Sequence, residues 1–277
     1  MYPKYFIGPM TKNVVDATIE FVENTGNKIA FIPSRRQVEF NGGYVNRWNT
    51  KNFVEYVKTK TELITIQRDH SGPGQGYTDD DGYNSLAEDA KYFDLIHIDP
   101  WKKYSEYTEG LKWTVNMIKY CNNINPNLLY EVGTEQSIRK FESEELNRFI
   151  FDLKYELQSD KLFNKIKYIV IQSGTSLLGN TQTGEYDKGR LISMVEVAKH
   201  HGLLSKEHNG DYIQSSVIKQ KFSFGLDAIN IAPEFGLIET NTYLNEIRNT
   251  DMFDKFWKIC FESDLWKKWV DEIGRAH

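Results

Sequence analysis

The stretch that decides the fold is LITIQRDHSG, residues 63–72. Its first half has the length and composition of a strand buried on both faces, and its second half is polar. Seven further stretches repeat this pattern, beginning at residues 4, 28, 95, 128, 168, 203 and 228: KYFIGPMT, KIAFIPSRRQ, LIHIDPW, LLYEVGTEQ, YIVIQSGTS, LLSKEHNGD and AINIAPEFG. Strand and helix alternating eight times over about 250 residues is typical of an α/β protein with a TIM (β/α)8 barrel.

The composition sets limits on the class of protein. The net charge of −5 and the pI near 5.8 argue against a general nucleic-acid binder, which would need a basic face. No apolar run approaches the ~20 residues needed to span a bilayer, and the amino end runs into the first strand without a secretory pattern. Cys121 and Cys260 provide neither a disulfide framework nor a zinc knuckle. We therefore expect a soluble, cytoplasmic enzyme scaffold.

The chain divides into three parts. Residues 1–245 are expected to form the barrel, with helices at 12–24, 51–58, 107–122, 144–157, 188–201 and 212–222. Residues 246–272 turn helical and aromatic, which predicts the start of a C-terminal helical segment that packs on the barrel. Residues 273–277 match the translation of a common sequencing adapter, so we interpret them as foreign and expect the natural protein to continue.

Polar side chains follow several of the predicted strands. Asp69 and His70 come directly after the third strand, and His97 and Asp99 share one face of the fourth. A rim histidine can bind a metal, while a carboxylate orients it or transfers a proton. The alternative is a bracing role in the loops, and a buried His97 is as readily a hydrogen-bonded core residue.

Further candidates follow the fifth and seventh strands. Glu131 lies in the fifth strand and Glu135 just beyond it, and either would serve as a general base, a metal ligand or a loop salt-bridge partner. His208 follows the seventh strand. In contrast, His200–His201 closes a helix, where a structural role is expected. Histidines and carboxylates meeting at one barrel mouth would suit a divalent ion such as Zn²⁺.

Phosphate binding is the second function that the loops allow. Barrels hold substrate phosphates on backbone N–H groups after their last strands. The segments Ser173–Thr175 and Asn209–Gly210, with Gly236, are candidates, and Arg35 or Arg36 would add positive charge. A glycine that simply makes a turn is the alternative for each.

Six segments, taken in order, resemble the Z-type subunit of class II D-tagatose-1,6-bisphosphate aldolase. The family's loop SNQVxxxGGYTGxTPxDF is similar to residues 34–53 (SRRQVEFNGGYVNRWNTKNF), GGDHLGPN to 68–74 (RDHSGPG), HLDASM to 97–101 (HIDPW), YVIGTEVP to 130–136 (YEVGTEQ), VVQPG to VIQSG ending at 174, and EAHSTDYQ to 206–213 (KEHNGDYI). The resemblance covers nearly all of the first 240 residues. It implies a TIM barrel of the class II aldolase type and a C-terminal helical region that is truncated here.

The resemblance also assigns residues. It places the family's glutamate on Glu135, so that His70, Glu135 and His208 would hold a divalent metal, with Asp99 or Asp69 transferring the proton. The expected substrate-binding residues are Arg35, Gln37, Gln172, Ser173, Gly174, Asn209, Gly210 and Asp211. The family's lysine in KVGPALTFALRE is replaced by Asn230, the asparagine of SNQV gives way to Arg35–Arg36, and VPVPGGE is not retained after Glu135. These departures indicate a divergent branch with a differently shaped or charged substrate.

We therefore expect a metal-dependent carbon–carbon lyase of carbohydrate metabolism that cleaves a ketose phosphate or related acidic sugar through an enediolate. One alternative is a non-catalytic subunit that stabilises a partner tagatose-bisphosphate aldolase, since Z-type proteins have been regarded in that way. A second alternative is a metal-dependent sugar-phosphate isomerase or epimerase, which uses the same enediolate. A homo-oligomer is compatible with each, whereas no nucleic acid or membrane partner is expected.

Overall fold

The computed structural model describes residues 2–269. The adapter-like residues 273–277, and the last three residues of the expected helical segment, lie outside this range.

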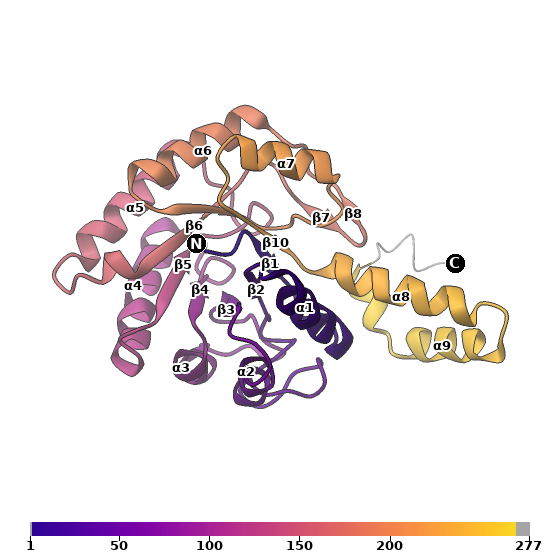
Figure 1. The fold of residues 1–277 in the computed structure, drawn as a ribbon. Coiled ribbons are helices and arrows are strands. Elements are labelled where there is room, and N and C mark those ends of the chain that lie inside the picture. Colours follow the sequence, from indigo (N-terminus) through magenta and orange to yellow (C-terminus); the bar gives the residue numbers. More distant parts are fainter. Residues whose placement is uncertain (1, 270–277) are drawn as a thin grey trace.

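Eight parallel strands close into a barrel in the order β1-β10-β9-β6-β5-β4-β3-β2 (Figure 1). Their bounds are β1 Tyr5–Ile7, β2 Ile29–Phe31, β3 Ile64–Ser71, β4 Leu95–Ile98, β5 Leu129–Val132, β6 Ile166–Ile171, β9 Leu204–Glu207 and β10 Ala228–Ile231. Each of the eight predicted apolar runs thus supplies one barrel strand, and the predicted TIM barrel is confirmed. A small antiparallel pair, β7 Leu177–Leu178 and β8 Thr181–Gln182, lies in the loop after β6.

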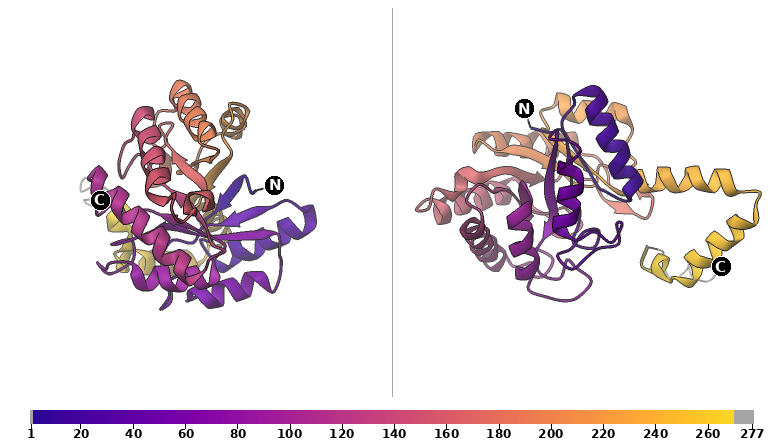
Figure 2. Two further views of the ribbon diagram at one scale, coloured as in Figure 1. Left: turned by 90° about the vertical axis from the view of Figure 1, so that its left-hand side faces the viewer. Right: turned by 60° about the horizontal axis from the view of Figure 1, so that its bottom comes forward.

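Helices cover the outside of the barrel (Figures 1 and 2). They are α1 Lys12–Thr25, α2 Thr50–Lys58, α3 Tyr83–Tyr92, α4 Tyr107–Ile124, α5 Ser143–Leu157, α6 Lys188–His200 and α7 Ser215–Ser223, with a short 3₁₀ helix η1 at Leu162–Lys165. In α1 the Thr11 side chain accepts from the Val14 N–H, and Gly26 ends the helix at φ 68°. The prediction for α7 began too early, because Tyr212 has φ 59° and cannot continue into a right-handed helix.

The chain beyond β10 leaves the barrel. Helix α8, Pro233–Ile247, starts two residues after β10 and runs through the expected domain boundary at residue 245. Helix α9, Asp251–Glu262, turns back alongside it and is followed by the 3₁₀ helix η2, Leu265–Trp269. None of the residues of α8 and α9, all of which the structure describes, is buried. Most of α8 thus lies in the part that was assigned to the barrel, and both helices project from the barrel instead of packing on it.

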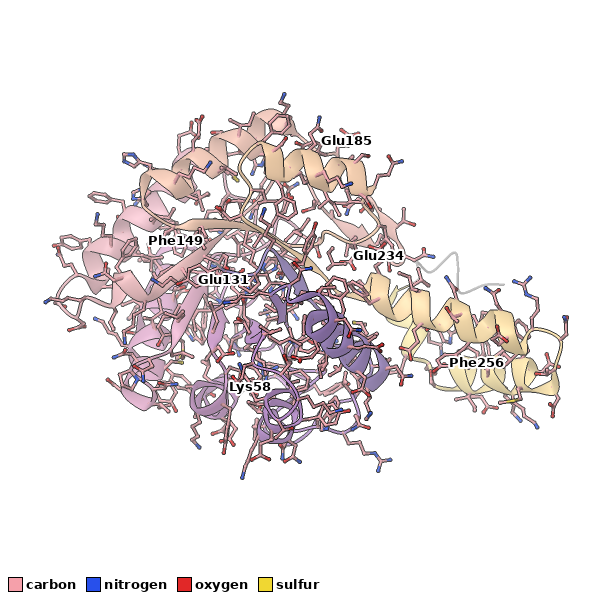
Figure 3. All side chains as sticks on the ribbon, viewed as in Figure 1. Lys58, Glu131, Phe149, Glu185, Glu234 and Phe256 are labelled. Atoms are coloured by element: carbon pink, nitrogen blue, oxygen red, sulfur yellow. The ribbon has the colours of Figure 1, made fainter. Side chains whose placement is uncertain are left out.

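The barrel interior has an apolar and a polar part. Six side chains form the apolar cluster: Phe6, Ala30, Ile32, Leu95, Tyr168 and Ala228. The polar part contains Gln67, His97, Glu131 and Lys206, all fully buried. Figure 3 shows Glu131 near the centre of the barrel, whereas Phe149 lies out in the helical layer. Polar groups buried this way need partners: Gln67, Glu131 and Lys206 are hydrogen-bonded to one another, and Glu131 also bonds to His208 of the barrel mouth.

Cys121 is buried, Cys260 is partly exposed, and both are free thiols. Within residues 2–269, none of the helices combines the length and apolar character required to cross a membrane.

Candidate metal centre

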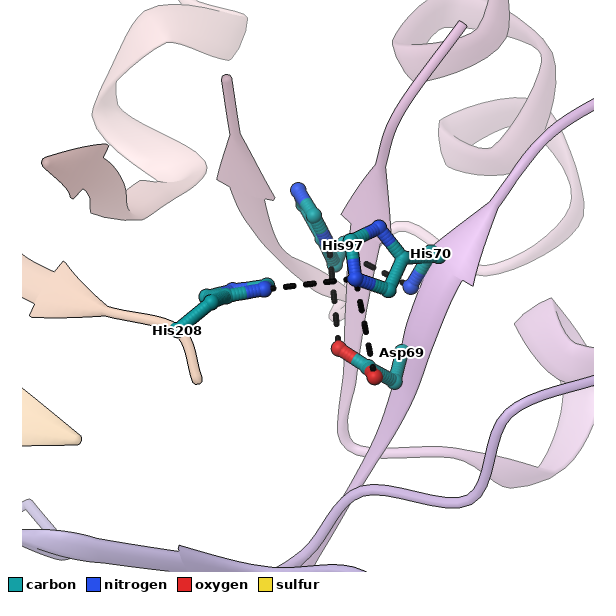
Figure 4. Close-up of side chains that lie close together, drawn as sticks. All are labelled: Asp69, His70, His97 and His208. Atoms are coloured by element: carbon teal, nitrogen blue, oxygen red, sulfur yellow. Dashed lines mark hydrogen bonds and ion pairs between the residues drawn. The ribbon is translucent and has the colours of Figure 1, made fainter. Parts of the chain in front are cut away.

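Four side chains meet at the C-terminal mouth of the barrel (Figure 4). Asp69, His70, His97 and His208 each offer one ligand atom, and these four atoms lie within 4.8 Å of one another. Asp69 and His70 come from the end of β3, His97 from β4, and His208 from the residue after β9. Ring closure thus brings together groups that are up to 139 positions apart in the chain, as the barrel prediction required.

His70 is held by Asp99. Its Nδ1 lies 2.6 Å from Asp99 Oδ2, and the same carboxylate oxygen accepts from Thr134 Oγ1 at 3.1 Å. Asp99 Oδ1 accepts from the Trp101 N–H at 3.2 Å. Asp99 is fully buried and occupied on both oxygens, so it orients His70 and leaves His70 Nε2 facing the centre. This geometry is unlike that expected of a proton-transfer group in contact with substrate.

The charge around His70 favours its protonated form. Burial opposes the charge, but the carboxylates of Asp69, Asp99 and Glu135 raise the pKa of His70 to about 10. Burial also acts to raise the pKa of Asp99, but the hydrogen bond from His70 holds it below its usual value. A bound cation would replace the proton on His70 as the positive charge of this site.

His208 is oriented from below by Glu131. His208 Nε2 lies 2.8 Å from Glu131 Oε1, and His208 Nδ1 lies 3.4 Å from His70 Nε2. An ionised carboxylate can accept hydrogen bonds but cannot donate them. Burial would raise the pKa of Glu131, but Lys206, His97 and His208 hold that pKa well below the usual value, so Glu131 is ionised. The proton of a neutral His208 is therefore on Nε2, and its Nδ1 lone pair points into the centre.

His97 has both ring nitrogens engaged. Its Nε2 lies 3.0 Å from the Gly133 carbonyl oxygen, and its Nδ1 accepts the His70 backbone N–H at 3.2 Å. Burial lowers the pKa of His97 to about 4. His70 has φ 44°, a left-handed conformation that costs energy in a residue with a side chain, so the hydrogen bond that its backbone N–H donates to His97 supports a strained backbone.

Two carboxylates face His70 Nε2 from the mouth. Asp69 Oδ2 lies 3.9 Å away and Glu135 Oε2 lies 3.8 Å away. Glu135 is anchored, because Asn209 Nδ2 donates to its Oε2 at 2.7 Å and Ser137 Oγ to its Oε1 at 2.5 Å. Asp69 is held more weakly, by Asn230 Nδ2 at 3.3 Å.

Three of the expected substrate-binding side chains form ion pairs or hydrogen bonds with other groups of the protein. Arg35 is buried and pairs with Glu39 at 2.7 Å and Asp80 at 2.6 Å, and these carboxylates outweigh burial and raise its pKa. Gln37 Oε1 accepts the Ser34 N–H at 2.8 Å. Gln172 accepts the Phe141 N–H and donates to the carbonyls of Thr134 and Arg139. All three brace the loops around the mouth.

The remaining expected residues surround the other side of the mouth. Ser173 donates to Glu207 through both its backbone N–H and its hydroxyl. Gly210 lies so close to Ile229 that a Cβ would come within 2.5 Å of that side chain. Asp211 accepts from the N–H groups of Ala232 and Glu234, and burial raises its pKa to about 6. Gly174, at φ 100°, packs against the Glu185 carbonyl. Asn209 reaches the cluster of the mouth through its hydrogen bond to Glu135, which faces His70.

Sequence reasoning missed Gln67 and Lys206. Both lie inside apolar strands, at positions that the pattern assigned to a buried face. The available signal was the period of two along a strand, which places Lys206 on the same side as His208.

The chain is thus a closed parallel TIM barrel that carries imidazoles and carboxylates at its C-terminal mouth, the end where enzymes of this fold place their active sites. No family model matches the sequence, and a search of curated proteins finds no match. Solved structures match in fold. A probable tagatose 6 phosphate kinase from Sinorhizobium meliloti 1021 is 15% identical with a TM-score of 0.78, covering 97% of this chain and 77% of that one.

Two aldolase structures are also similar. A putative fructose-1,6-biphosphate aldolase from Coccidioides immitis is 15% identical with a TM-score of 0.61, covering 90% of this chain and 79% of that one. The fructose-bisphosphate aldolase of Campylobacter jejuni is 14% identical with a TM-score of 0.61, covering 89% and 76% respectively. At these identities the comparisons establish a shared barrel fold, which agrees with the expected TIM barrel.

Proposed function

We propose that this chain is a class II, metal-dependent aldolase-like lyase that cleaves a carbon–carbon bond of a ketose phosphate or related acidic sugar. The observation that carries the proposal is the meeting of His70, His208, Asp69 and Glu135 at the catalytic end of the barrel. The similarity in fold to structures titled as aldolases supports the choice of reaction class. A cytoplasmic location is part of the same proposal.

The donor set fits a divalent cation of the Zn²⁺ type. His70 and His208 each turn one ring nitrogen toward the centre while a carboxylate holds the other, which is the arrangement of metal-ligating histidines. Glu135 would complete the ligands, because its hydrogen bonds to Ser137 and Asn209 orient it beforehand. Imidazole and carboxylate donors suit Zn²⁺. When bound, such an ion would polarise a substrate carbonyl and stabilise negative charge on its oxygen.

Asp69 is the residue that we assign to proton transfer. It stands at the mouth, partly exposed and weakly held, whereas Asp99 is buried and occupied by His70. A carboxylate free to exchange a proton with a substrate hydroxyl is what cleavage next to a carbonyl requires. Asn230, which donates to Asp69, would keep its carboxylate directed into the mouth.

A second candidate function is supported by a different part of the surface. A groove of about 800 Å³ lies between α1, α7 and α8 and is lined mainly by apolar side chains, including Ile7, Val14, Phe21 and Ile218. Exposed side chains of this lining, including Phe21 and Ile238, provide apolar surface that favours contact with another protein. It is the observation that favours a non-catalytic subunit supporting a partner aldolase.

Metal analysis and isotope exchange test the proposal together. The protein should carry one divalent ion per chain and should exchange a substrate carbon-bound hydrogen with deuterated water on candidate ketose phosphates. Product analysis separates lyase from isomerase, because only the lyase yields two shorter carbonyl compounds. Absence of both metal and exchange, with a rise in a partner aldolase's activity on mixing, would establish the supporting subunit instead.

A further inference from the structure

Strand β9 carries two buried lysine–glutamate pairs on its opposite faces. Lys206 Nζ lies 2.6 Å from Glu131 Oε2, and Lys221 Nζ lies 2.6 Å from Glu207 Oε2. All four side chains are fully buried. Because Glu131 comes from β5, which is not a neighbour of β9, the first pair crosses the barrel interior. The second pair joins β9 to α7 in the helical layer.

A buried ion pair contributes little net free energy to folding stability. Desolvation of two charges consumes most of their attraction, and apolar residues of similar volume often serve as well. The Lys221 pair has an evident further contact, since Lys221 Nζ also donates to Ser173 Oγ at 2.8 Å. The Lys206 pair instead contacts His208, through Glu131.

The interior pair leads directly to the proposed metal centre. Lys206 Nζ donates to Glu131 Oε2 and, at 2.9 Å, to Gln67 Oε1, while Gln67 Nε2 donates to the same Glu131 oxygen. The other oxygen of Glu131 is left for His208 Nε2 at 2.8 Å. Lysine has donors and no acceptor, so the Glu131 atom that faces it must be an acceptor. Because two cationic or polar donors meet at this oxygen and the pKa of Glu131 is held well below its usual value, the carboxylate is ionised and its other oxygen also accepts, from His208 Nε2.

We infer that Lys206 and Glu131 are positioning residues that fix the His208 proton on Nε2 and so present the Nδ1 lone pair to a divalent cation. The inference rests on the proposed function for its cation, but the state of the His208 ring can be read in the cation-free protein. Neither residue touches the centre itself. Both act through His208.

Glu131→Gln gives a directional test. The amide oxygen must face Lys206, so the amide NH₂ group faces His208 Nε2, which then has to accept, and the ring proton moves to Nδ1. Nitrogen NMR of the ring should report this exchange of protonated nitrogen. Titration with Co²⁺ and Zn²⁺ should show affinity lower by about 10- to 100-fold, the usual effect of losing a partner behind a ligand.

The double variant Glu131→Gln with Lys206→Met distinguishes two effects of the single variant: the reversed hydrogen bond to His208 and the loss of the Glu131 charge. Without the lysine, the amide is free to turn its oxygen toward His208, so the proton should be shared between the two nitrogens and part of the affinity should return. If the single variant does not fold, the double variant provides the test of the inference instead. An unchanged Nε2 proton in either folded variant would overturn the inference.

Lys221→Met is the matched control. It removes the lysine of the other buried pair on β9, so it should lower stability while leaving the His208 ring and the Co²⁺ affinity unchanged. An equal loss of affinity in this variant would also overturn the inference. If the unaltered protein binds neither ion, the proposed metal site fails, while the NMR comparison still tests the role of Lys206 and Glu131.

Discussion

Asp99 holds His70 through a hydrogen bond of 2.6 Å between Oδ2 and Nδ1, and it does so from a fully buried position. The two residues are 29 positions apart and lie at the ends of adjacent strands. This contact turns His70 Nε2 toward the centre. The first prediction follows from it.

Asp99→Asn should weaken binding of Zn²⁺ or Co²⁺ by about 10- to 100-fold, because an amide supports the ring and its charge less well than a carboxylate. Isothermal titration measures the change. Thr134→Val is the control, since it removes a donor to Asp99 and leaves the contact with His70 in place. Equal affinities for the Asp99 variant and the unaltered protein would show that His70 is not a ligand.

Metal affinity should rise with pH. The pKa of His70 is raised to about 10 in the metal-free protein, so at neutral pH a cation has to displace its proton. Below pH 10 the apparent affinity should therefore increase by up to about tenfold per pH unit for this one proton. Titrations at several pH values in buffers of different ionisation enthalpy would count the released protons. Affinity independent of pH would contradict His70 as a ligand.

The same pKa predicts how stability of the metal-free protein depends on pH. Because the folded-state pKa of about 10 exceeds the ordinary value of 6.5, the folded protein binds the proton more tightly. The resulting contribution is fully present below pH 6.5, declines as pH rises, and is lost above pH 10. Urea unfolding from pH 6 to 10 measures it, with His70→Gln expected to show a flatter profile.

Substitutions of Asp69 and Glu135 should have different effects on metal binding and on activity. Asp69→Asn is expected to keep the metal and lose activity by about 100-fold or more, as for removal of a general acid–base group. Glu135→Gln is expected to lose metal affinity, since its carboxylate is the proposed ligand. Metal content and hydrogen–deuterium exchange of the substrate distinguish the two. The reverse pattern would exchange their roles.

The buried ion pair that joins β3 to α3 should matter mainly for stability, because its arginine is paired with a helix residue and not with the groups of the mouth. Arg68 and Asp89 are fully buried and joined by two hydrogen bonds of 2.7 Å. Asp89→Ala leaves an uncompensated buried guanidinium and should lower the free energy of unfolding by about 3–5 kcal/mol. Chemical denaturation measures this loss. The exposed pair Lys255–Asp251 is the control, and Asp251→Ala should change stability by less than about 1 kcal/mol.

The strands were predictable because each barrel strand is a local apolar run, and the residue that follows it must lie at the mouth. That logic placed Asp69, His70 and His208 correctly at one end of the barrel. The pair β7–β8 was not predicted, since strands of two residues carry no periodic signal.

What failed to follow from the sequence depends on contacts between distant residues. Arg35 was expected to meet substrate, but Asp80, 45 positions away, neutralises it. Lys206 was read as part of an apolar strand, and its partner Glu131 lies 75 positions earlier. Charge compensation of this kind is decided by which strands face each other across the barrel, and a linear pattern does not contain that information.

The departure of α8 from the barrel leaves the seam between β1 and β10 lined on its outer side by an open groove. This seam joins residues more than 220 positions apart, so we expect it to form later in folding than the pairs between strands that are near in sequence. Its amide hydrogens should accordingly exchange with solvent before those between β4 and β5, a difference that mass spectrometry of deuterated fragments can resolve. The barrel would then open most readily where its first and last strands pair, on the side that carries the apolar groove.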